Sequence, residues 1–191
     1  MSRIAAVIIA GGKRSALIDE QILPSLVGFD ETLVVGEHHT GDGYRYLHVP
    51  DLTKSTNDAL VKRDVGTLAT TADILLYLSD DHAVREGFAR ELRTLIADAI
   101  AVWDVLVPSR WVEHPEQGLI RIPNGENEWY CAGHGGVFRR RVIQARPWTA
   151  QQHSRNWDLT SSHDHLRAGF VYLPAPQLQI QDMEPFNTPW L

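Results

Sequence analysis

The chain has 191 residues, of which 43% are hydrophobic and 22% charged, and its formal net charge is −6 at pH 7. This length suits one domain with a sizeable core, and the composition is that of an ordinary globular protein. The acidic balance argues against a protein that coats nucleic acid, although it leaves room for a local basic groove. The single cysteine, Cys131, excludes an intrachain disulfide and any cysteine-rich zinc site.

No apolar run approaches the length of a membrane span, and the first ten residues do not follow the plan of a signal peptide. Arg3 instead precedes a short stretch that is typical of a strand. We therefore expect no integral membrane segment and a cytoplasmic location, which for a phage-encoded protein would be the host cytoplasm.

Strands and helices alternate through the first two-thirds of the chain. Apolar runs predict strands over residues 4–9, 32–36, 44–49, 73–78 and 103–107. Ser55 has the chemistry of an N-cap, with Asp58 three residues later, and opens a predicted helix to about Arg63 that continues as helix or turn over 64–72. A clearer helix is predicted over 84–100, because its apolar residues share one face. This order predicts an α/β protein with a mostly parallel sheet and helices on both faces.

The last third of the chain is less regular, and Pro, Gly, Glu, His and Trp accumulate over residues 108–136. Further strands are predicted over 119–122, 129–132, 170–173 and 177–181. A helix is expected from Val137, a long loop over 146–162 and a short helix over 162–168. No repeat, low-complexity tract or linker interrupts the sequence, which predicts a single domain over 1–191.

The most informative stretch is an apolar strand that ends in two carboxylates and an imidazole. Residues 74–78 are apolar without polar alternation, which indicates a strand buried on both faces, and Asp80, Asp81 and His82 follow. Ligands of open α/β sheets bind at the carboxyl ends of the strands. Adjacent carboxylates are costly to leave unpaired, and a hard divalent cation is their usual partner. The alternative is an Asp-Asp turn or a helix N-cap ahead of Val84.

The order of these features resembles the GT-A glycosyltransferases, particularly those of glycosyltransferase family 2. The segments that carry the resemblance are Ala6–Ile9, Leu33–Val35, Asn57–Ala59 with Lys62–Gly66, Leu76–Asp81, Gly135–Arg140 and His163–Phe170. Together they span roughly residues 4–175. Two segments depart from the family pattern. Ser79 stands where the first Asp of the family's DXD motif is usual, and His163 replaces the usual Glu before Asp164.

This resemblance implies a GT-A fold, described as a Rossmann-like three-layer sandwich with a mostly parallel central sheet. The single catalytic domain would have a nucleotide-binding part at about 1–107 and an acceptor-side part at about 108–191. The implied function is metal-dependent transfer of a hexosyl or pentosyl group from a UDP- or GDP-type nucleotide sugar to an acceptor hydroxyl. The acceptor classes that fit are a glycan, a small molecule and a hydroxymethylated DNA base of phage type.

On this resemblance Asp81 is the expected metal ligand, His82 lies beside it, and Asp182 would complete the metal shell. Asp80 is assigned to the nucleotide, at its ribose. Bound Mn²⁺ or Mg²⁺ would act as a Lewis acid on the leaving diphosphate. A histidine ligand would favour Mn²⁺ over Mg²⁺.

Asp164 is the expected catalytic base, which would take the proton of the acceptor hydroxyl as its oxygen attacks the anomeric carbon. The alternative is an acidic residue near a helix start, where the helix dipole favours it. His163 and His165 would serve as second ligands, acceptor contacts or surface residues. Because they point to different sides of a helix, at most one is expected to face the site with Asp164.

The nucleotide sugar would be bound by residues that follow the first strand and by residues on the first long helix. These are Gly11, Gly12, Lys13, Arg14, Lys62, Arg63 and Asp64. The alternatives are a plain turn with a solvated basic pair and a solvated helix end. A donor or acceptor loop is expected to contain Gly133, His134, Gly135, Gly136, Trp129 and Trp157. Aromatic faces suit sugar rings, although at least two of Trp111, Trp129, Trp148 and Trp157 are expected in the core.

Two other functions stay open. The segment Ile8–Arg14 is similar to the A-G-G-x-G-x-R loop of sugar-nucleotide pyrophosphorylases, which would make the chain a nucleotidyltransferase, but the third Gly is missing. The altered Ser-Asp-Asp motif is also compatible with a non-enzymatic carbohydrate- or nucleic-acid-binding protein on a degenerate GT-A scaffold. The basic run Arg139–Arg141 leaves a modified DNA acceptor open.

Overall fold

The structure is a computed structural model that describes residues 2–11, 13–37, 44–50, 56–98, 102–121, 135–150 and 164–183. Its strands are β1 (Ile4–Ala10), β2 (Glu31–Gly36), β3 (Arg45–His48), β4 (Ile74–Ser79), β5 (His82–Val84), β6 (Val105–His114), β7 (Gly118–Arg121), β8 (Val137–Arg139) and β9 (Tyr172–Asp182). Its helical elements are α1 (Ser15–Leu17), the π-helical turn η1 (Ile18–Ile22), α2 (Leu23–Ser25), α3 (Thr56–Ala69), α4 (Phe88–Ala97), α5 (Arg140–Ala145) and the 3₁₀ turn η3 (Trp148–Ala150). This mixed order confirms the predicted α/β class.

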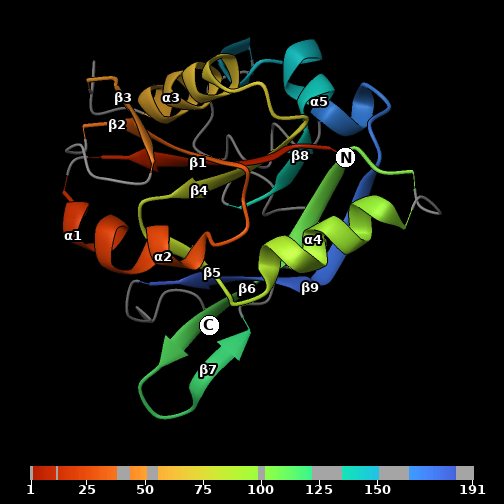
Figure 1. The fold of residues 1–191 in the computed structure, drawn as a ribbon. Coiled ribbons are helices and arrows are strands. Elements are labelled where there is room, and N and C mark those ends of the chain that lie inside the picture. The colour runs from red at the N-terminus through yellow and green to blue at the C-terminus, as the bar shows by residue number, and fades with distance from the viewer. Residues whose placement is uncertain are drawn as a thin grey trace.

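One sheet runs through the molecule in the order β3-β2-β1-β4-β8-β6-β9-β5, and β7 pairs with β6 (Figure 1). The strands β3, β2, β1 and β4 are parallel, as predicted, and so is the pair β6 and β9. The four other pairings, which involve β5, β7 and β8, are antiparallel. The sheet is therefore mixed and curled, and it differs from the plain Rossmann sandwich that the sequence led us to expect.

β1 lies at the centre of the parallel half and is buried along its whole length. Its residues alternate between two cores, because successive side chains of a strand point to opposite faces. Ile4 and Ile8 pack in the core that includes η1 and α4, whereas Ala5 and Val7 pack in the core that includes α3 and α5. Such burial on both faces explains why the strand has no polar alternation.

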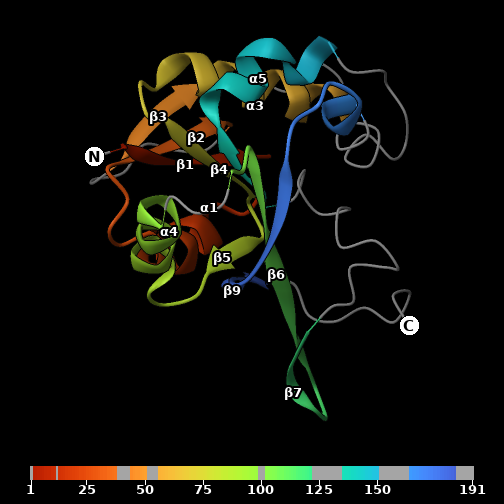
Figure 2. The same cartoon turned by 90° about the vertical axis from the view of Figure 1, so that its right-hand side faces the viewer.

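Helices cover both faces of the sheet, as predicted. Figure 2 shows α3 and α5 on one side of β1 and β4, and α1 and α4 on the other, where Figure 1 also shows α2. Gly66 lets α3 approach β1 closely, since a Cβ at this position would lie 2.4 Å from Cγ1 of Val7. None of the described helices combines the length and the apolar character needed to cross a bilayer.

Several predicted boundaries are wrong, for local reasons. The helix expected over 84–100 begins only at Phe88, because residues 82–84 pair with β9 and Gly87 turns the chain at φ 85°. The helix expected from Val137 is preceded by β8, which inserts between β4 and β6. The helical segment over 15–25 was not predicted at all.

The two strands expected over 170–173 and 177–181 form one strand, β9. Pro174 and Pro176 interrupt the pattern in the sequence, yet the strand continues, with a register shift against β6 between Pro108 and Ser109. The Ser109 hydroxyl lies within hydrogen-bonding distance of the carbonyl oxygens of Pro176 (2.9 Å) and Leu178 (3.2 Å) at this shift. The strand predicted over 129–132 lies outside the described residues.

Candidate functional site

The carboxyl ends of β1, β2 and β4 lie side by side, because these three strands are adjacent and parallel. Ile9 pairs with Ser79, so Gly11 and Asp80 leave neighbouring strands at the same edge. The Gly11 amide donates to Oδ2 of Asp80 (2.9 Å), and the Arg14 guanidinium donates to Oδ1 (2.8 Å). Both oxygens of this buried carboxylate therefore fix the loop that follows β1.

A second close approach brings the end of β2 against the end of β1. Gly36 pairs with Ala10 and adopts φ +145°, and a Cβ there would lie 1.9 Å from the Ala10 carbonyl oxygen. Only glycine fits without moving the backbone. Buried Lys62 on α3 donates its Nζ to the same Ala10 oxygen (2.9 Å). These contacts hold together the carboxyl ends of β1 and β2, beside the end of β4 where Asp80 and Asp81 lie.

Asp81 lies one residue beyond Asp80, and its side chain is 20% exposed. Its Oδ2 is 3.6 Å from the Arg14 guanidinium, and its Oδ1 is 3.0 Å from Nδ1 of His82. Oδ1 is buried and makes no hydrogen bond of good geometry within the described part of the chain. Burial opposes ionisation, but the adjacent His82 ring and the Arg14 guanidinium outweigh it and lower the pKa of Asp81 to about 2. The residue is therefore an anion at neutral pH.

His82 and Asp182 face each other across the pairing of β5 with β9, and Arg110 on β6 joins them. The Arg110 guanidinium donates to Nε2 of His82 (2.8 Å) and to Oδ2 of Asp182 (3.1 Å). Because a guanidinium only donates, Nε2 of this His82 accepts, and the ring proton of the neutral imidazole lies on Nδ1, towards Asp81. Burial raises the pKa of Asp182, although His82 and Arg110 oppose this effect.

The structure thus brings together the three predicted metal ligands, Asp81, His82 and Asp182. They do not form a closed cage: no group of three or more His, Cys, Asp or Glu side chains among the described residues is arranged to hold a metal ion. His82 fits poorly as a ligand, since its nitrogens face Arg110 and Asp81. The Asp81 carboxylate does fit, because its Oδ2 lies on the side of the partly exposed Arg14 and Mg²⁺ is commonly held by one or two carboxylates and completed by substrate phosphates and water.

The predicted nucleotide-contacting residues of α3 have structural partners. Arg63 is 1% exposed, and its guanidinium lies over the Trp148 ring, 5.4 Å from the centroid. Asp64 accepts hydrogen bonds from the Trp148 amide (2.9 Å), the Thr149 amide (3.0 Å) and the Thr149 hydroxyl (2.7 Å). Asp64 therefore caps η3, and both residues join α3 to that turn. Their proposed contacts with a nucleotide stay predictions.

His165 lies in the core and not on an accessible surface. Its ring is fully buried among aromatic side chains that include Phe138 and Trp148, and its Nδ1 is 2.8 Å from the Tyr172 hydroxyl. Burial lowers the pKa of His165 to about 4, against the opposing effects of a backbone hydrogen bond with Arg146 and the charge of Asp164. A fully buried ring cannot touch an acceptor, so the predicted acceptor contact is wrong for this residue.

Asp164 begins the described part of a short helix, residues 164–167, and 36% of its side chain is exposed. Its Oδ1 lies 4.0 Å from the Arg167 guanidinium one turn later. This exposure leaves the carboxylate accessible, and its role as a base stays a prediction.

Of the predicted donor or acceptor loop, Gly135 and Gly136 are described and buried. Gly135 adopts φ +131°, and a Cβ there would lie 2.4 Å from Cδ1 of Ile180, so the glycine serves close packing against β9. Lys13 is exposed beside Arg14. The other predicted site residues lie outside the described residues: Gly12, Trp129, Gly133, His134, Trp157 and His163.

The three side chains of the basic run Arg139–Arg141 all have partners within the fold. Arg139 stacks over the Trp103 ring, 4.2 Å from the centroid, and donates to the Trp103 carbonyl oxygen (2.7 Å). Arg140 donates to the carbonyl oxygens of Ala72 (2.7 Å), Thr67 (2.8 Å) and Thr70. Arg141 donates to Asp104 (2.8 Å). The fold therefore accounts for Arg139 and Arg140, whereas the Arg141 side chain is 63% exposed, and the run as a whole gives little support to a DNA-binding surface.

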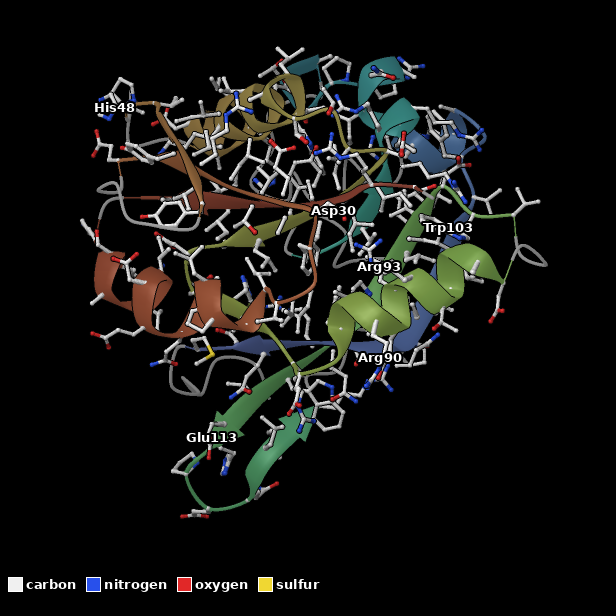
Figure 3. All side chains as sticks on the ribbon, viewed as in Figure 1. Asp30, His48, Arg90, Arg93, Trp103 and Glu113 are labelled. Atoms are coloured by element: carbon white, nitrogen blue, oxygen red, sulfur yellow. The ribbon has the colours of Figure 1, made fainter. Side chains whose placement is uncertain are left out.

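A groove of about 840 Å³ lies between α2 and α4 and is lined by Val27, Gly28 and Ala89, with Arg90 and Arg93 on α4 (Figure 3). Arg93 is paired with Asp30 (2.9 Å) and donates to the Gly28 carbonyl oxygen. Asp80, Asp81 and Asp182 do not line this groove. The candidate site is therefore the strand edge and not this groove.

Two residues of the site were missed by the sequence analysis. Arg110 lies in β6, beyond the strand predicted over 103–107, and its pairing with His82 and Asp182 depends on three strands distant in sequence. Gly36 ends the predicted strand over 32–36, and its approach to Ala10 follows from the pairing of β1 with β2. A glycine at the end of a buried strand was the only signal that could have indicated it.

No protein-family model matches this sequence, and no curated protein matches it. The fold is similar to the crystal structure of S. aureus TarS 1–349, with a TM-score of 0.66, 12% identity, and coverage of 94% of this chain and 60% of that chain. TarS 1–349 in complex with UDP-GlcNAc gives a TM-score of 0.66 and 13% identity, with coverage of 97% and 59%. This chain therefore spans about three-fifths of the TarS chain. The likeness shows a glycosyltransferase-like fold.

Proposed function

We propose that this protein transfers a sugar from a nucleotide-diphosphate sugar to an acceptor hydroxyl. The observation that carries the proposal is the Asp80–Asp81 pair at the carboxyl end of β4, tied to the loop after β1, on a glycosyltransferase-like fold. The TarS structure with UDP-GlcNAc supports a nucleotide sugar as the donor class. A family-2 assignment rests on the sequence resemblance and is part of this proposal.

The loop after β1 supplies the contacts proposed for the diphosphate. Asp80 holds Gly11 and Arg14 in place, and it is itself 8% exposed, so the loop is fixed before a ligand arrives. The Arg14 side chain is 35% exposed and carries the charge and the paired donors that suit phosphate oxygens. Asp80 thus acts mainly by positioning, and its predicted ribose contact would use the free lone pairs of its two oxygens.

Asp81 is the residue proposed to hold a divalent cation, with Asp182 nearby. When bound, Mn²⁺ or Mg²⁺ would stabilise the negative charge that develops on the leaving diphosphate. The low pKa of Asp81 keeps its carboxylate ionised across the physiological range, and its Oδ2, which lies 3.6 Å from the Arg14 guanidinium, is the oxygen proposed to meet the cation. His82 lies 3.0 Å from this carboxylate and is itself held by Arg110, so the two residues are proposed to orient Asp81 and not to bind the cation.

Asp164 is proposed to accept the proton of the acceptor hydroxyl in an inverting reaction. An exposed carboxylate at the start of a helix can take this proton as the acceptor oxygen forms its bond to the anomeric carbon and the diphosphate leaves. The acceptor classes proposed are a glycan, a small molecule or a modified DNA base. The structural contacts of Arg139–Arg141 lend no support to the DNA acceptor.

The test is a donor screen that measures release of nucleoside diphosphate from UDP- and GDP-sugars, with and without Mn²⁺. We expect metal-dependent release of nucleoside diphosphate from at least one donor, and we expect Asp81→Asn to lose nearly all of this release. Asp98→Asn is the matched control, since Asp98 is exposed beyond the end of α4. A parallel reaction with nucleoside triphosphate and sugar phosphate tests the alternative. Pyrophosphate formation without sugar-nucleotide turnover would show a nucleotidyltransferase instead.

A further inference from the structure

Arg14 is the cation nearest to the acidic pair. A single guanidinium nitrogen lies 2.8 Å from Oδ1 of Asp80 and 3.6 Å from Oδ2 of Asp81. The two carboxylates are 11% and 20% exposed, whereas the Arg14 side chain is 35% exposed. The guanidinium thus belongs to the most exposed of the three side chains, and it supplies positive charge to two carboxylates that are largely buried, as a divalent cation would.

The Arg14 side chain can leave this position without disturbing the loop. The backbone is held by a hydrogen bond from the Ile18 amide to the Arg14 carbonyl oxygen (3.0 Å). Asp80 keeps its bond from the Gly11 amide (2.9 Å) whichever way the guanidinium points. A move of the Arg14 guanidinium thus leaves both of these backbone anchors in place.

Arg110 is the other arginine of the cluster, and its position is different. Its side chain is 17% exposed and bridges His82 and Asp182 across two strands, so it cannot swing out without breaking contacts on both. Arg14 differs from Arg110 because its side chain is more exposed and because it pairs with both Asp80 and Asp81.

We propose, on the basis of the function proposed above, that Arg14 is a resident counter-ion of the Asp80–Asp81 pair. A divalent cation displaces its guanidinium, which then binds the donor diphosphate. The Arg14 guanidinium and a metal ion repel each other if both contact Oδ1 of Asp80 and Oδ2 of Asp81. In the absence of nucleotide, Arg14 and the metal ion therefore compete for these two oxygens. With nucleotide present, the released guanidinium gains phosphate oxygens as partners. Metal ion and diphosphate then favour each other's binding by the same factor.

The test measures Mn²⁺ affinity of the nucleotide-free protein by titration, and then the affinity for UDP and GDP at saturating Mn²⁺. Arg14→Gln should bind Mn²⁺ about five- to tenfold more tightly than the parent, the effect expected from removing one competing charge near the surface. The same variant should bind the diphosphate more weakly. Arg14→Lys, which keeps the charge, should stay close to the parent in Mn²⁺ affinity. Arg45→Gln is the matched control, because Arg45 pairs with Glu31 at 3.2 Å elsewhere on the surface.

Unchanged or weaker Mn²⁺ binding by Arg14→Gln would overturn the inference, as would a parent and variant that both fail to bind Mn²⁺. Tighter Mn²⁺ binding with unchanged diphosphate affinity would also overturn it, since the guanidinium would then have no role at the phosphate. A parent that binds Mn²⁺ but no nucleoside diphosphate would refute the proposed function. The nucleotide-free titration still decides in that case whether Arg14 competes with the cation. Circular dichroism of each variant checks that the fold is retained.

Discussion

The buried imidazole of His165 predicts a specific loss of stability at mildly acidic pH. Its pKa in the folded protein is about 4, against 6.5 for an unperturbed histidine. The unfolded chain therefore binds a proton between these pH values that the folded protein does not bind. Stability should fall as the pH decreases from about 6.5 to about 4 and change little above that window. The difference between the two pKa values corresponds to about 3 kcal/mol of unfolding free energy.

The perturbation is His165→Asn, which removes the titration while its amide oxygen can still accept from the Tyr172 hydroxyl. Urea unfolding at a series of pH values from 7 to 4 gives the free energy of unfolding of the parent and of the variant. The variant will be less stable at pH 7, because it leaves a cavity, but its stability should depend less on pH. The difference in unfolding free energy between the parent and His165→Asn should therefore become smaller by about 3 kcal/mol as the pH falls from 6.5 to 4.

Burial raises the pKa of Asp182 towards this window, but Asp182 titrates in the parent and in the variant alike, so its effect cancels in the difference between their unfolding free energies. The pKa of Asp81 is lowered from 3.8 to about 2, so its stabilising contribution is lost only as the pH falls through that lower range. His165→Phe, which keeps a ring in the aromatic cluster, should show the same reduced dependence. If the difference in unfolding free energy between His165→Asn and the parent stays constant from pH 6.5 to 4, the imidazole of His165 is not buried in its neutral form.

Three further predictions concern the fold and the proposed chemistry. Gly36→Ala should destabilise the protein by at least about 3 kcal/mol through its clash with Ala10, whereas Gly169→Ala, also at positive φ but in open space, should cost about 1 kcal/mol; equal losses in urea unfolding would contradict the clash. Asp64→Ala should lower the unfolding free energy by about 2 kcal/mol, because three donors of η3 lose their acceptor; unchanged stability in urea unfolding would contradict this cap, and weaker nucleotide binding would support the predicted nucleotide role of Asp64. Asp164→Asn should lower kcat and kcat/KM together by about 10²- to 10⁴-fold with donor affinity retained, since an amide cannot take the acceptor's proton; transfer near the parent rate would remove this residue from the mechanism.

The parallel half of the fold could be predicted from the sequence because its signals are local. The apolar runs of β1 and β4 show no polar alternation, and the structure buries both strands on both faces. The placement of Asp80 and Asp81 at a strand's carboxyl end followed from the same pattern, since the end of a buried strand is visible in sequence. For this part of the chain, composition and order were sufficient.

The antiparallel half could not be predicted, because its pairings depend on distant segments. β8 is three residues long and gains its strand conformation from β4 and β6 on either side. His82 looked like a metal ligand beside Asp81, but the partner that occupies its Nε2 is Arg110, 28 residues away. His165 carried no sequence signal for burial, since its aromatic neighbours come from several elements. The place of a residue in the fold was predictable where a motif is contiguous, and contacts were missed where the partner is remote.

The most direct test of the proposed site is the joint effect of nucleoside diphosphate and Mn²⁺ on thermal stability. Ligands that share a site at the Asp80–Asp81 edge bind cooperatively, and binding to the folded state raises the melting temperature by mass action. We predict that UDP or GDP together with Mn²⁺ raises the melting temperature by more than the sum of the separate shifts. This excess should vanish in Asp81→Asn and persist in Asp98→Asn. Additive or absent shifts in the parent, or an excess that survives Asp81→Asn, would contradict a shared diphosphate and metal site at this edge.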